Sequence, residues 1–396
     1  MALAELNLLD LRCIETARLE FGSGINLIYG ANGAGKTSLL EAVFLLGRGR
    51  SFRNRLNERL IRHGQSVSRV VGKTHPAPQS MADGSLTATG TIHTLGLEIR
   101  REGSESGGTV ARLDGAATRS MAELALAFPV QALDPDAHKL IEESAARRRR
   151  WLDWAVFHVE HSFAGAWSRY QRALQQRNAA LRSGSREVGA WEPEMAREGE
   201  SLTASRERVM VALQPYWAEI STELVGLELT LGFQAGWDRS ASLADALTAS
   251  IPRDRDRHTT TTGPHRADVS FRLRGKLARE VLSRGQQKLA AVALHLCQLE
   301  YLKREHGLLP TLLLDDPSAE LDQDRLGRFI RRVQCLETQI IVTALERDTR
   351  LFGTPDRVFH VEQGRGEGGK GAGLGRSGDF AAYGFDVRQR LDAVPA

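Results

Sequence analysis

Near its amino terminus the chain reads Gly30-Ala31-Asn32-Gly33-Ala34-Gly35-Lys36-Thr37. The apolar run 25–29 before it has the length of a short buried strand, and residues 38–46 after it have the apolar pattern of a buried helix. A glycine-rich loop between a strand and a helix forms a cradle for phosphate groups, because glycine permits unusual backbone angles and a close approach of the anion. The segment therefore predicts a nucleotide-binding loop, formed by Gly30, Ala31, Asn32, Gly33, Ala34, Gly35, Lys36, Thr37 and Ser38.

Two side chains of this loop have specific expected roles. The Lys36 ammonium group is expected to reach the β- and γ-phosphates, and the Thr37 hydroxyl is expected to ligate Mg²⁺. The helix that begins near Gly35 directs the positive end of its dipole at the same place. A nucleoside triphosphate with Mg²⁺ is therefore the expected ligand.

A second informative stretch is Leu312-Leu313-Leu314-Asp315-Asp316, where two carboxylates follow an apolar strand. At the carboxyl end of a strand, Asp315 is expected to hold Mg²⁺ directly or through water. Asp316 is expected to orient or deprotonate the water that attacks the γ-phosphate. The alternative is a solvated strand end without a catalytic role.

A third stretch is Leu282-Ser283-Arg284-Gly285-Gln286, which stands before the helical run 288–301. A Ser hydroxyl and a Gly amide at a helix N-terminus can bind an anion. The glycine loop already supplies ligands for its own phosphates, so Ser283, Gly285 and Gln286 are expected to contact a nucleotide held by a second protomer. The alternative is that this stretch only caps the helix.

The composition of the 396-residue chain, 41% hydrophobic and 26% charged, is ordinary for a soluble globular protein. The sequence has no apolar run of about 18 residues and no secretory signal, so a membrane protein is not expected. Cys13, Cys297 and Cys335 are far apart in the sequence and fit reduced thiols in the cytoplasm. The net charge of +4 permits nucleic-acid binding without establishing it.

Hydrophobic periodicity divides the chain into an α/β part and a mainly helical part. Residues 66–125 alternate as strands do and predict a small antiparallel sheet. Between residues 136 and 224 the spacing becomes helical, and a Ser- and Gly-rich break at 183–193 predicts a hairpin of two helices. The expected domains are residues 1–135 with 305–396, and residues 136–304.

With these stretches in this order, the chain resembles the RecF family of bacterial recombination-repair ATPases, which are related to the heads of ABC-type and SMC proteins. The resemblance implies an α/β fold: an ABC-type P-loop ATPase head, built from a mixed sheet with helices and an antiparallel β subdomain, with a second, mainly helical lobe. It covers nearly the whole sequence, and its most specific parts are residues 30–37, 49–53, 149–153, 262–268, 282–288 and 313–322.

The resemblance also implies roles for single residues. Gln131 is similar to the glutamine that senses Mg²⁺ and the γ-phosphate. Residues 318–322 are similar to the loop that passes between protomers and brings Asp322 to the nucleotide. The histidine that contacts the γ-phosphate in transport ATPases is absent here, and Thr343 or Glu346 is the expected substitute.

The function implied by the resemblance is that of an ATP-dependent homodimer that binds single-stranded DNA and junctions of single- and double-stranded DNA. With RecO and RecR, such proteins load RecA onto gapped DNA in repair, replication restart and the SOS response. Most ABC-type enzymes have Glu where this chain has the shorter Asp316, so slow, DNA-stimulated hydrolysis is expected. The alternatives are an SMC-like structural DNA tether, and a nucleotide-gated binding module without significant turnover.

Arginines supply the candidate DNA contacts. One group follows the helix of the glycine loop and another lies in the helical part: the candidates are Arg50, Arg53, Arg55, Arg59, Arg62, Arg147 and Arg148. Phosphate contacts of this kind predict sequence-neutral binding that weakens steeply with salt. A solvated charged surface is the alternative. Residues 364–378 are Gly-rich and are expected to form a flexible loop or tail.

Overall fold

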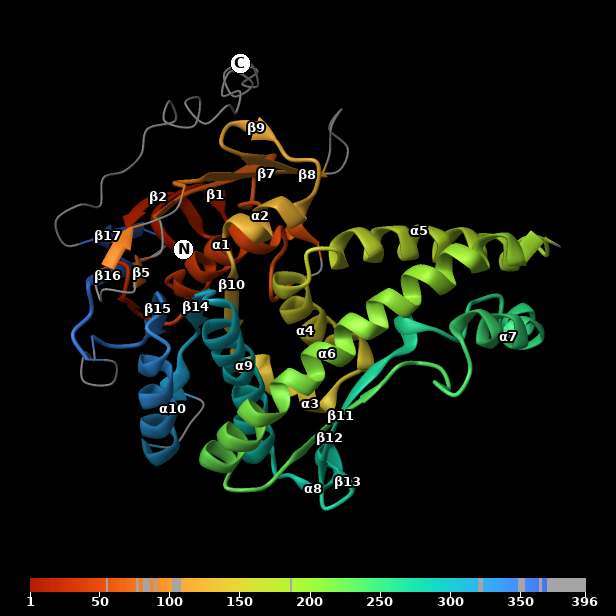
Figure 1. Ribbon diagram of the computed structural model, residues 1–396. Coiled ribbons are helices and arrows are strands. Elements are labelled where there is room, and N and C mark those ends of the chain that lie inside the picture. Colours follow the sequence, from red (N-terminus) through yellow and green to blue (C-terminus); the bar gives the residue numbers. More distant parts are fainter. Residues whose placement is uncertain are drawn as a thin grey trace, which may run out of the picture. The chain divides into compact units, whose positions relative to one another are not determined.

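The computed structural model describes residues 1–54, 56–75, 78–80, 86–88, 91–101, 108–185, 187–319, 323–347, 353–362 and 365–368. Figure 1 shows the chain coloured along its sequence. The chain forms two compact units, Met1–Pro135 with Leu308–Ala396, and Asp136–Gly307.

The first unit contains a six-stranded sheet, formed in spatial order by β10 (Val130–Leu133), β14 (Thr311–Leu314), β15 (Ile340–Ala344), β3 (Ile25–Tyr29), β16 (Arg357–Glu362) and β17 (Arg365–Gly368). Neighbouring strands are parallel except for the β16–β17 pair. All four residues of β14 are buried, because a parallel sheet is covered on both faces and needs apolar strands. β3, the strand before the glycine loop, lies between β15 and β16 and is therefore an inner strand of this sheet.

The second sheet of this unit is antiparallel. It is formed in spatial order by β2 (Ile14–Glu20), β1 (Ala2–Leu11), β4 (Val67–His75), β7 (Thr94–Arg100), β8 (Gly108–Leu113) and β9 (Ala116–Ala117). The antiparallel sheet expected from residues 66–125 is present, and the first two strands of the chain extend it. β5 (Pro78–Ser80) and β6 (Leu86–Ala88) form a separate pair.

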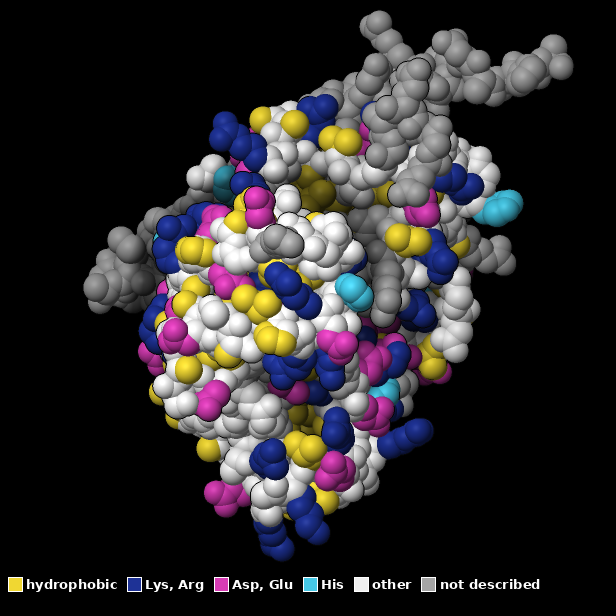
Figure 2. All heavy atoms as spheres, turned by 90° about the vertical axis from the view of Figure 1, so that its right-hand side faces the viewer, with side chains coloured by type: hydrophobic (Ala, Val, Ile, Leu, Met, Phe, Trp, Pro, Cys, Tyr) yellow, Lys and Arg dark blue, Asp and Glu magenta, His cyan; other side chains and the backbone are white. Residues whose placement is uncertain are grey.

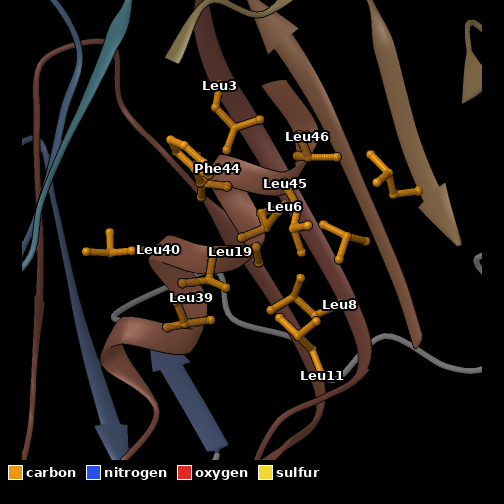
Figure 3. Close-up of a cluster of buried hydrophobic side chains, with 14 of the residues drawn as sticks. Leu3, Leu6, Leu8, Leu11, Leu19, Leu39, Leu40, Phe44, Leu45 and Leu46 are labelled. Carbon is orange, nitrogen blue, oxygen red and sulfur yellow. The ribbon is translucent and has the colours of Figure 1, made fainter. Parts of the chain in front are cut away.

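Helix α1 (Lys36–Arg48) supplies the core of the first unit. Its leucine side chains pack against those of β1 and β2, as Figure 3 shows. The same buried cluster includes Leu313, Ile341 and Phe359 of the parallel sheet, so α1 contacts both sheets. Each buried leucine contributes about 1.5–3 kcal/mol, so this packing fixes the helix and the loop at its start. Helices α2 (Met121–Ala127) and α10 (Gln323–Cys335) complete the unit.

The second unit is mainly helical. Its helices are α3 (Lys139–Glu142), α4 (Ala145–Val159), α5 (Phe163–Arg182), α6 (Glu192–Val225), α7 (Leu243–Arg257), α8 (Ala278–Val281) and α9 (Arg284–His306). β11 (Thr230–Gln234), β12 (Asp268–Leu273) and β13 (Lys276–Leu277) form an antiparallel sheet. Helices α5 and α6 pack along each other as a hairpin (Figure 1).

Two features of this unit differ from the expectation. The helical stretch before the 183–193 break is two helices, α4 and α5, because the chain leaves the helical conformation at Glu160, where φ is −109° and ψ is 95°. The apolar spacing continues through this break, so periodicity could not reveal it. Helix α7 was not expected either; it begins after Ser242, whose side chain caps it by accepting from Asp245 N. Among the residues that the structure describes, no helix has both the length and the apolar character to cross a membrane.

Candidate nucleotide site

The glycine loop joins β3 to α1. Gly30, Gly33 and Gly35 have φ values of 154°, 80° and 113°, a region that larger residues rarely adopt. A Cβ atom on Gly30 would lie 2.3 Å from the carbonyl oxygen of Val361, so no larger residue fits there beside β16. These glycines have the backbone shape that a phosphate cradle needs.

The N-terminus of α1 is open to an anion. Gly35 is the N-cap residue and makes no side-chain cap bond, and the first turn has no acidic residue. The first N–H groups of a helix have no partner inside the helix, and they carry the positive end of its dipole. A phosphate group placed here would accept hydrogen bonds from them.

Lys36 folds back over the loop. Its Nζ donates to the carbonyl oxygens of Gly30 at 2.6 Å and of Ala31 at 3.0 Å, and the residue is 8% exposed. Carbonyl oxygens satisfy the hydrogen-bond donors of an ammonium group but do not neutralise its charge. A buried positive charge therefore lies beside the open end of α1.

Asp315 is held between two threonines. Thr37 Oγ1 donates to Asp315 Oδ1 at 3.0 Å and lies 3.1 Å from Oδ2, and Thr343 Oγ1 donates to Oδ1 at 2.9 Å. The three residues meet because β3, β15 and β14 are adjacent parallel strands whose carboxyl ends form one edge of the sheet. A hydroxyl beside a carboxylate suits Mg²⁺, which takes oxygen ligands and, in phosphate sites, few of them from the protein.

Asp316 follows with a left-handed backbone, at a φ of 48°. Its N–H donates to Thr343 Oγ1 at 2.9 Å, and its Oδ1 accepts from Ser318 Oγ at 3.0 Å. Thr343 thus bonds to both acidic residues, which makes it a positioning residue for the pair. Glu346, the other residue considered as a phosphate sensor, is exposed.

Gln131 is joined to the far end of α1. It is 5% exposed on β10, and its Oε1 accepts from Arg48 Nη2 at 2.9 Å. Burial, and then the charge of Arg50, lower the pKa of Arg48 well below its ordinary value. The single helix α1 therefore has the glycine loop at its start and Gln131 bonded at its end.

The arginines that follow α1 differ in their surroundings. Arg50, Arg53 and Arg59 are exposed. Arg62 is paired with Asp10 at 3.4 Å and Glu15 at 3.2 Å, so part of its charge is balanced within the unit. Arg55 lies outside the described residues.

A buried glutamate anchors this arginine segment, and the sequence analysis did not identify it. Glu41 on α1 is 1% exposed and pairs with Arg12 at 3.0 Å. Ser51 Oγ donates to Glu41, and the same hydroxyl accepts from the N–H groups of Arg53 at 2.9 Å and Asn54 at 3.0 Å. The signal in the sequence was one acidic residue inside the apolar stretch 38–46.

The second arginine pair is a weaker candidate for DNA than the sequence suggested. Arg148 is 7% exposed and is bonded to both carboxylate oxygens of Asp268, at 2.7 and 3.0 Å. Arg147 pairs with Glu143 at 2.9 Å. Most of the Arg148 side chain is therefore engaged within the unit. On the face drawn in Figure 2, Lys and Arg side chains are intermixed with acidic ones, so charge alone does not mark a DNA path there.

The Ser283 stretch caps α9. Ser283 Oγ accepts from Gln286 N at 3.3 Å, and Gln286 Oε1 accepts from Ser283 N at 2.9 Å, which together form a capping box. Ser283 and Gly285 are exposed. The capping role is real, and it leaves this helix terminus accessible to a ligand. Asp322, expected near the nucleotide, lies outside the described part of the chain.

Residues 262–268 hold the second unit together. Tyr170 donates to His265 Nδ1 at 2.6 Å, and His265 Nε2 donates to the Thr260 carbonyl oxygen at 3.1 Å; a carbonyl can only accept, which assigns the ring tautomer. Burial lowers the pKa of His265 to about 4, so the ring is neutral. Arg206 Nη1 donates to the Pro264 carbonyl oxygen at 2.8 Å. The stretch thus bonds to α5 and α6, a packing role that the residues alone did not reveal.

Comparison with known proteins gives matches over most of the chain. The family described as RecF/RecN/SMC N terminal domain matches residues 2–367. The DNA replication and repair protein RecF of Azotobacter vinelandii is 38% identical over 373 residues, which cover 92% of this chain and 98% of that protein. The protein of the same name from Pseudomonas paraeruginosa is 36% identical, and the match covers 92% of this chain and 97% of the relative.

Solved structures agree with these matches. The structure described as the recombination mediator protein RecF-ATP in the RecFOR pathway is 25% identical, has a TM-score of 0.79, and the match covers 93% of this chain and 97% of that one. An Smc head bound to the C-winged helix domain of ScpA has a TM-score of 0.55 at 17% identity and shows similarity of fold alone. The expected α/β ATPase-head fold is confirmed.

Proposed function

This chain belongs to the RecF family of DNA replication and repair proteins, and from that premise we propose that it is an ATP-dependent DNA-binding protein of recombinational repair and replication restart. The observation that carries the proposal is the bond of Thr37 to Asp315 at 3.0 Å, at the mouth of the glycine loop. A hydroxyl of the loop and a carboxylate of the next-but-one strand meet there, as the binding of a nucleotide with Mg²⁺ requires.

The bound nucleotide is ATP. Its phosphates accept hydrogen bonds from the loop and from the open end of α1, and Lys36 turns from the two carbonyl oxygens to the phosphates. Thr37, Asp315 and Gln131 would hold Mg²⁺, which would neutralise phosphate charge. Asp316 orients or deprotonates the attacking water. Its short side chain and the hydrogen bond from Ser318 make hydrolysis slow, and DNA stimulates it.

Two copies of the chain form the active assembly. Ser283, Gly285, Gln286 and Asp322 of one copy contact the ATP held by the other, so ATP joins the copies and hydrolysis separates them. The assembly grips single-stranded DNA and junctions of single- and double-stranded DNA while it is closed. Arg50, Arg53, Arg55 and Arg59 are the arginines that we propose for phosphate contacts with DNA.

The cellular role follows the pathway described for the solved relatives, the RecFOR pathway. We place the protein in the cytoplasm, as a partner of RecO and RecR in loading RecA onto gapped DNA and in normal SOS induction. A purely structural tether is less well supported, because α5 and α6, with 20 and 34 residues, are short for long DNA-spanning arms.

The first test is molar mass in solution by light scattering, without nucleotide and with ATP and Mg²⁺. Wild-type protein should change from monomer to dimer with ATP, and the dimer should persist longer in Asp316→Asn. Lys36→Ala is the matched control, because it should not bind ATP and should remain monomeric. A wild-type protein that binds ATP but stays monomeric with and without gapped DNA would contradict the dimer proposal.

A second candidate, a nucleotide-gated binding module without turnover, is favoured by the Ser318–Asp316 hydrogen bond at 3.0 Å, because that bond engages a carboxylate oxygen that would otherwise face the attacking water. Measuring phosphate release with and without gapped DNA separates the two. Release that is absent in both conditions, together with ATP-dependent dimerisation, would favour the module.

A further inference from the structure

The second unit contains a cavity of about 160 Å³ beside β12. Its lining comes from α3, α4, α8 and all three strands of the sheet, and its polar side chains are Arg148, Gln234, Asp268, Ser270, Arg272 and Arg279. All of these residues belong to Asp136–Gly307, and none belongs to the nucleotide loop.

One wall of the cavity is a rigid ion pair. Arg148 donates from Nε and Nη2 to the two carboxylate oxygens of Asp268, and from Nη1 to the Glu143 carbonyl oxygen at 2.6 Å. These bonds occupy three of the five N–H donors of the guanidinium group, so two donors remain. A nearly buried arginine in a fixed orientation, with donors to spare, is suited to recognise an anion.

Two more arginines line the same space. Arg272 Nη1 donates to the Gly275 carbonyl oxygen at 2.8 Å, which fixes its side chain across the β12–β13 turn. Arg279, at the start of α8, has its nearest carboxylate contact at 3.9 Å, with Glu280 at the surface. Both side chains have donors left for a ligand.

The face of β12 that carries these groups is polar. Asp268, Ser270 and Arg272 alternate along the strand and so share one face, and Gln234 is opposite Asp268 on β11. Within the described part of the chain, the side chains of Ser270 and Gln234 have no hydrogen-bond partner. They add a hydroxyl and an amide to the lining without adding negative charge.

We propose that this cavity binds a phosphate group. Three arginines and one aspartate line it and leave a net charge of +2, which matches a phosphate dianion better than a monovalent carboxylate. Planar guanidinium donors match the spacing of phosphate oxygens and bind them in pairs. The phosphate belongs either to a DNA backbone or to free inorganic phosphate, and these two sources share the same chemistry at the site.

The site is connected to the start of α9. Helix α8 ends at Val281, and Gln287 Nε2 donates to the Leu282 carbonyl oxygen at 3.0 Å, directly before Ser283. A phosphate bonded to Arg279 would therefore hold α8 and the Ser283 cap in place. An effect of this contact on ATP-driven dimerisation rests on the proposed dimer, whereas phosphate binding itself does not.

Calorimetric titration with inorganic phosphate tests the site on full-length Lys36→Ala protein, in chloride buffer, so that the glycine loop contributes less and the comparison of the two double variants isolates the cavity. We expect phosphate to bind this protein, and acetate not to compete. Adding Arg272→Gln with Arg279→Gln should weaken binding about tenfold or more. The matched control, Arg274→Gln with Lys276→Gln, removes two charges from the same hairpin outside the lining and should change little.

Absence of phosphate binding by Lys36→Ala protein, or an equal loss in both double variants, would overturn the proposal. Thermal unfolding checks that each variant is folded. Arg279→Gln alone, at a half-exposed side chain, serves if Arg272→Gln disturbs the hairpin. This test uses no ATP, so failure of the ATP-driven dimer leaves it unaffected.

Titration with a single-stranded oligonucleotide at several salt concentrations separates the two sources. If DNA supplies the phosphate, the cavity pair should lower DNA affinity and reduce the salt slope by about one relative to the control pair. If the two pairs bind DNA alike while phosphate binding differs, the site takes free phosphate. Either result supports the site and identifies its ligand.

Discussion

Arg48, at the end of α1, donates from Nη2 to Gln131 Oε1 at 2.9 Å. Its Nε donates to the Val130 carbonyl oxygen at 3.2 Å, so the guanidinium group holds the β10 strand at two points. The proposed contact of Gln131 with Mg²⁺ uses the same amide oxygen. If Gln131 ligates Mg²⁺ as proposed, we expect its bond to Arg48 to weaken when nucleotide binds.

Changing the amide to a carboxylate should resist this exchange. We expect Gln131→Glu to bond more tightly to Arg48, because charge-assisted hydrogen bonds are roughly twice as strong as neutral ones. ATP turnover at saturating ATP should fall several-fold, while ATP affinity changes little and the unfolding temperature rises. Gln131→Ala is the control, which should lower turnover without raising the unfolding temperature. Wild-type turnover in Gln131→Glu would mean that the Arg48 bond does not restrain Gln131.

The Ser283 side chain has a capping role and a proposed ligand role, and substitutions can separate them. Ser283→Ala should destabilise α9 by about 0.5–2 kcal/mol and weaken ATP-driven dimerisation. Ser283→Thr keeps a capping hydroxyl, so it should change the stability of α9 and ATP-driven dimerisation much less than Ser283→Ala does. Ser283→Arg should leave ATP binding intact and prevent dimerisation by its bulk. Light scattering and thermal unfolding measure the two effects, and a Ser283→Arg protein that dimerises normally would contradict the proposed dimer, in which Ser283 of one copy contacts the ATP of the other.

His265 should make the stability of the second unit dependent on pH. The unfolded ring takes up a proton near its ordinary pKa of about 6.5, whereas the folded ring stays neutral down to about pH 4. The unfolded state therefore binds more protons in this window, and stability falls as pH falls from about 6.5 to 4, by at most about 3 kcal/mol.

Urea unfolding at a series of pH values measures this dependence. His265→Gln should flatten it between pH 4 and 6.5. His161→Gln, which changes an exposed ring in the same unit, should leave it as in the wild type. An equal slope in wild type and His265→Gln would show that the ring is not the group responsible.

Two glycines of the nucleotide loop should respond differently to alanine. In Gly30→Ala the new Cβ would lie 2.3 Å from the Val361 carbonyl oxygen, so β3 or β16 must move. In Gly33→Ala nothing lies within 4 Å, and the φ of 80° adds only backbone strain of about 1–2 kcal/mol. Gly30→Ala should lower the unfolding temperature more and abolish ATP binding in a calorimetric titration. Equal effects would mean that the sheet relaxes around the added methyl group.

The sequence was sufficient to predict features that depend only on residues close together in the chain. The glycine loop, the strand that ends in Asp315 and Asp316, and the cap at Ser283 are short stretches whose residues determine their own conformation. The parallel order of the strands then brings Thr37 and Asp315 together. The fold class was predictable because these local stretches, in this order, resemble those of a known family.

Contacts between distant segments could not be read in this way. Glu41 pairs with Arg12 of the β1–β2 turn and with Ser51 beyond α1, and no spacing rule predicts either partner. Arg147 and Arg148 are neighbours of one residue type, yet only Arg148 is buried, because Asp268 of β12 lies within reach. The break at Glu160 leaves the apolar spacing intact and so left no trace in the periodicity.

The left-handed backbone of Asp316 bears on which acidic residue this chain can use. Asp and Asn are enriched several-fold over other non-glycine residues at positive φ, whereas Glu has no such preference. The φ of 48° and the bond of the Asp316 N–H to Thr343 therefore favour the short acid over the longer one. A variant with Glu at this position would gain reach but would lack the preference of Asp for this backbone conformation. Slow ATP hydrolysis would then follow from the backbone conformation at Asp316. Relatives that hydrolyse ATP faster would be expected to differ first in the backbone at this residue.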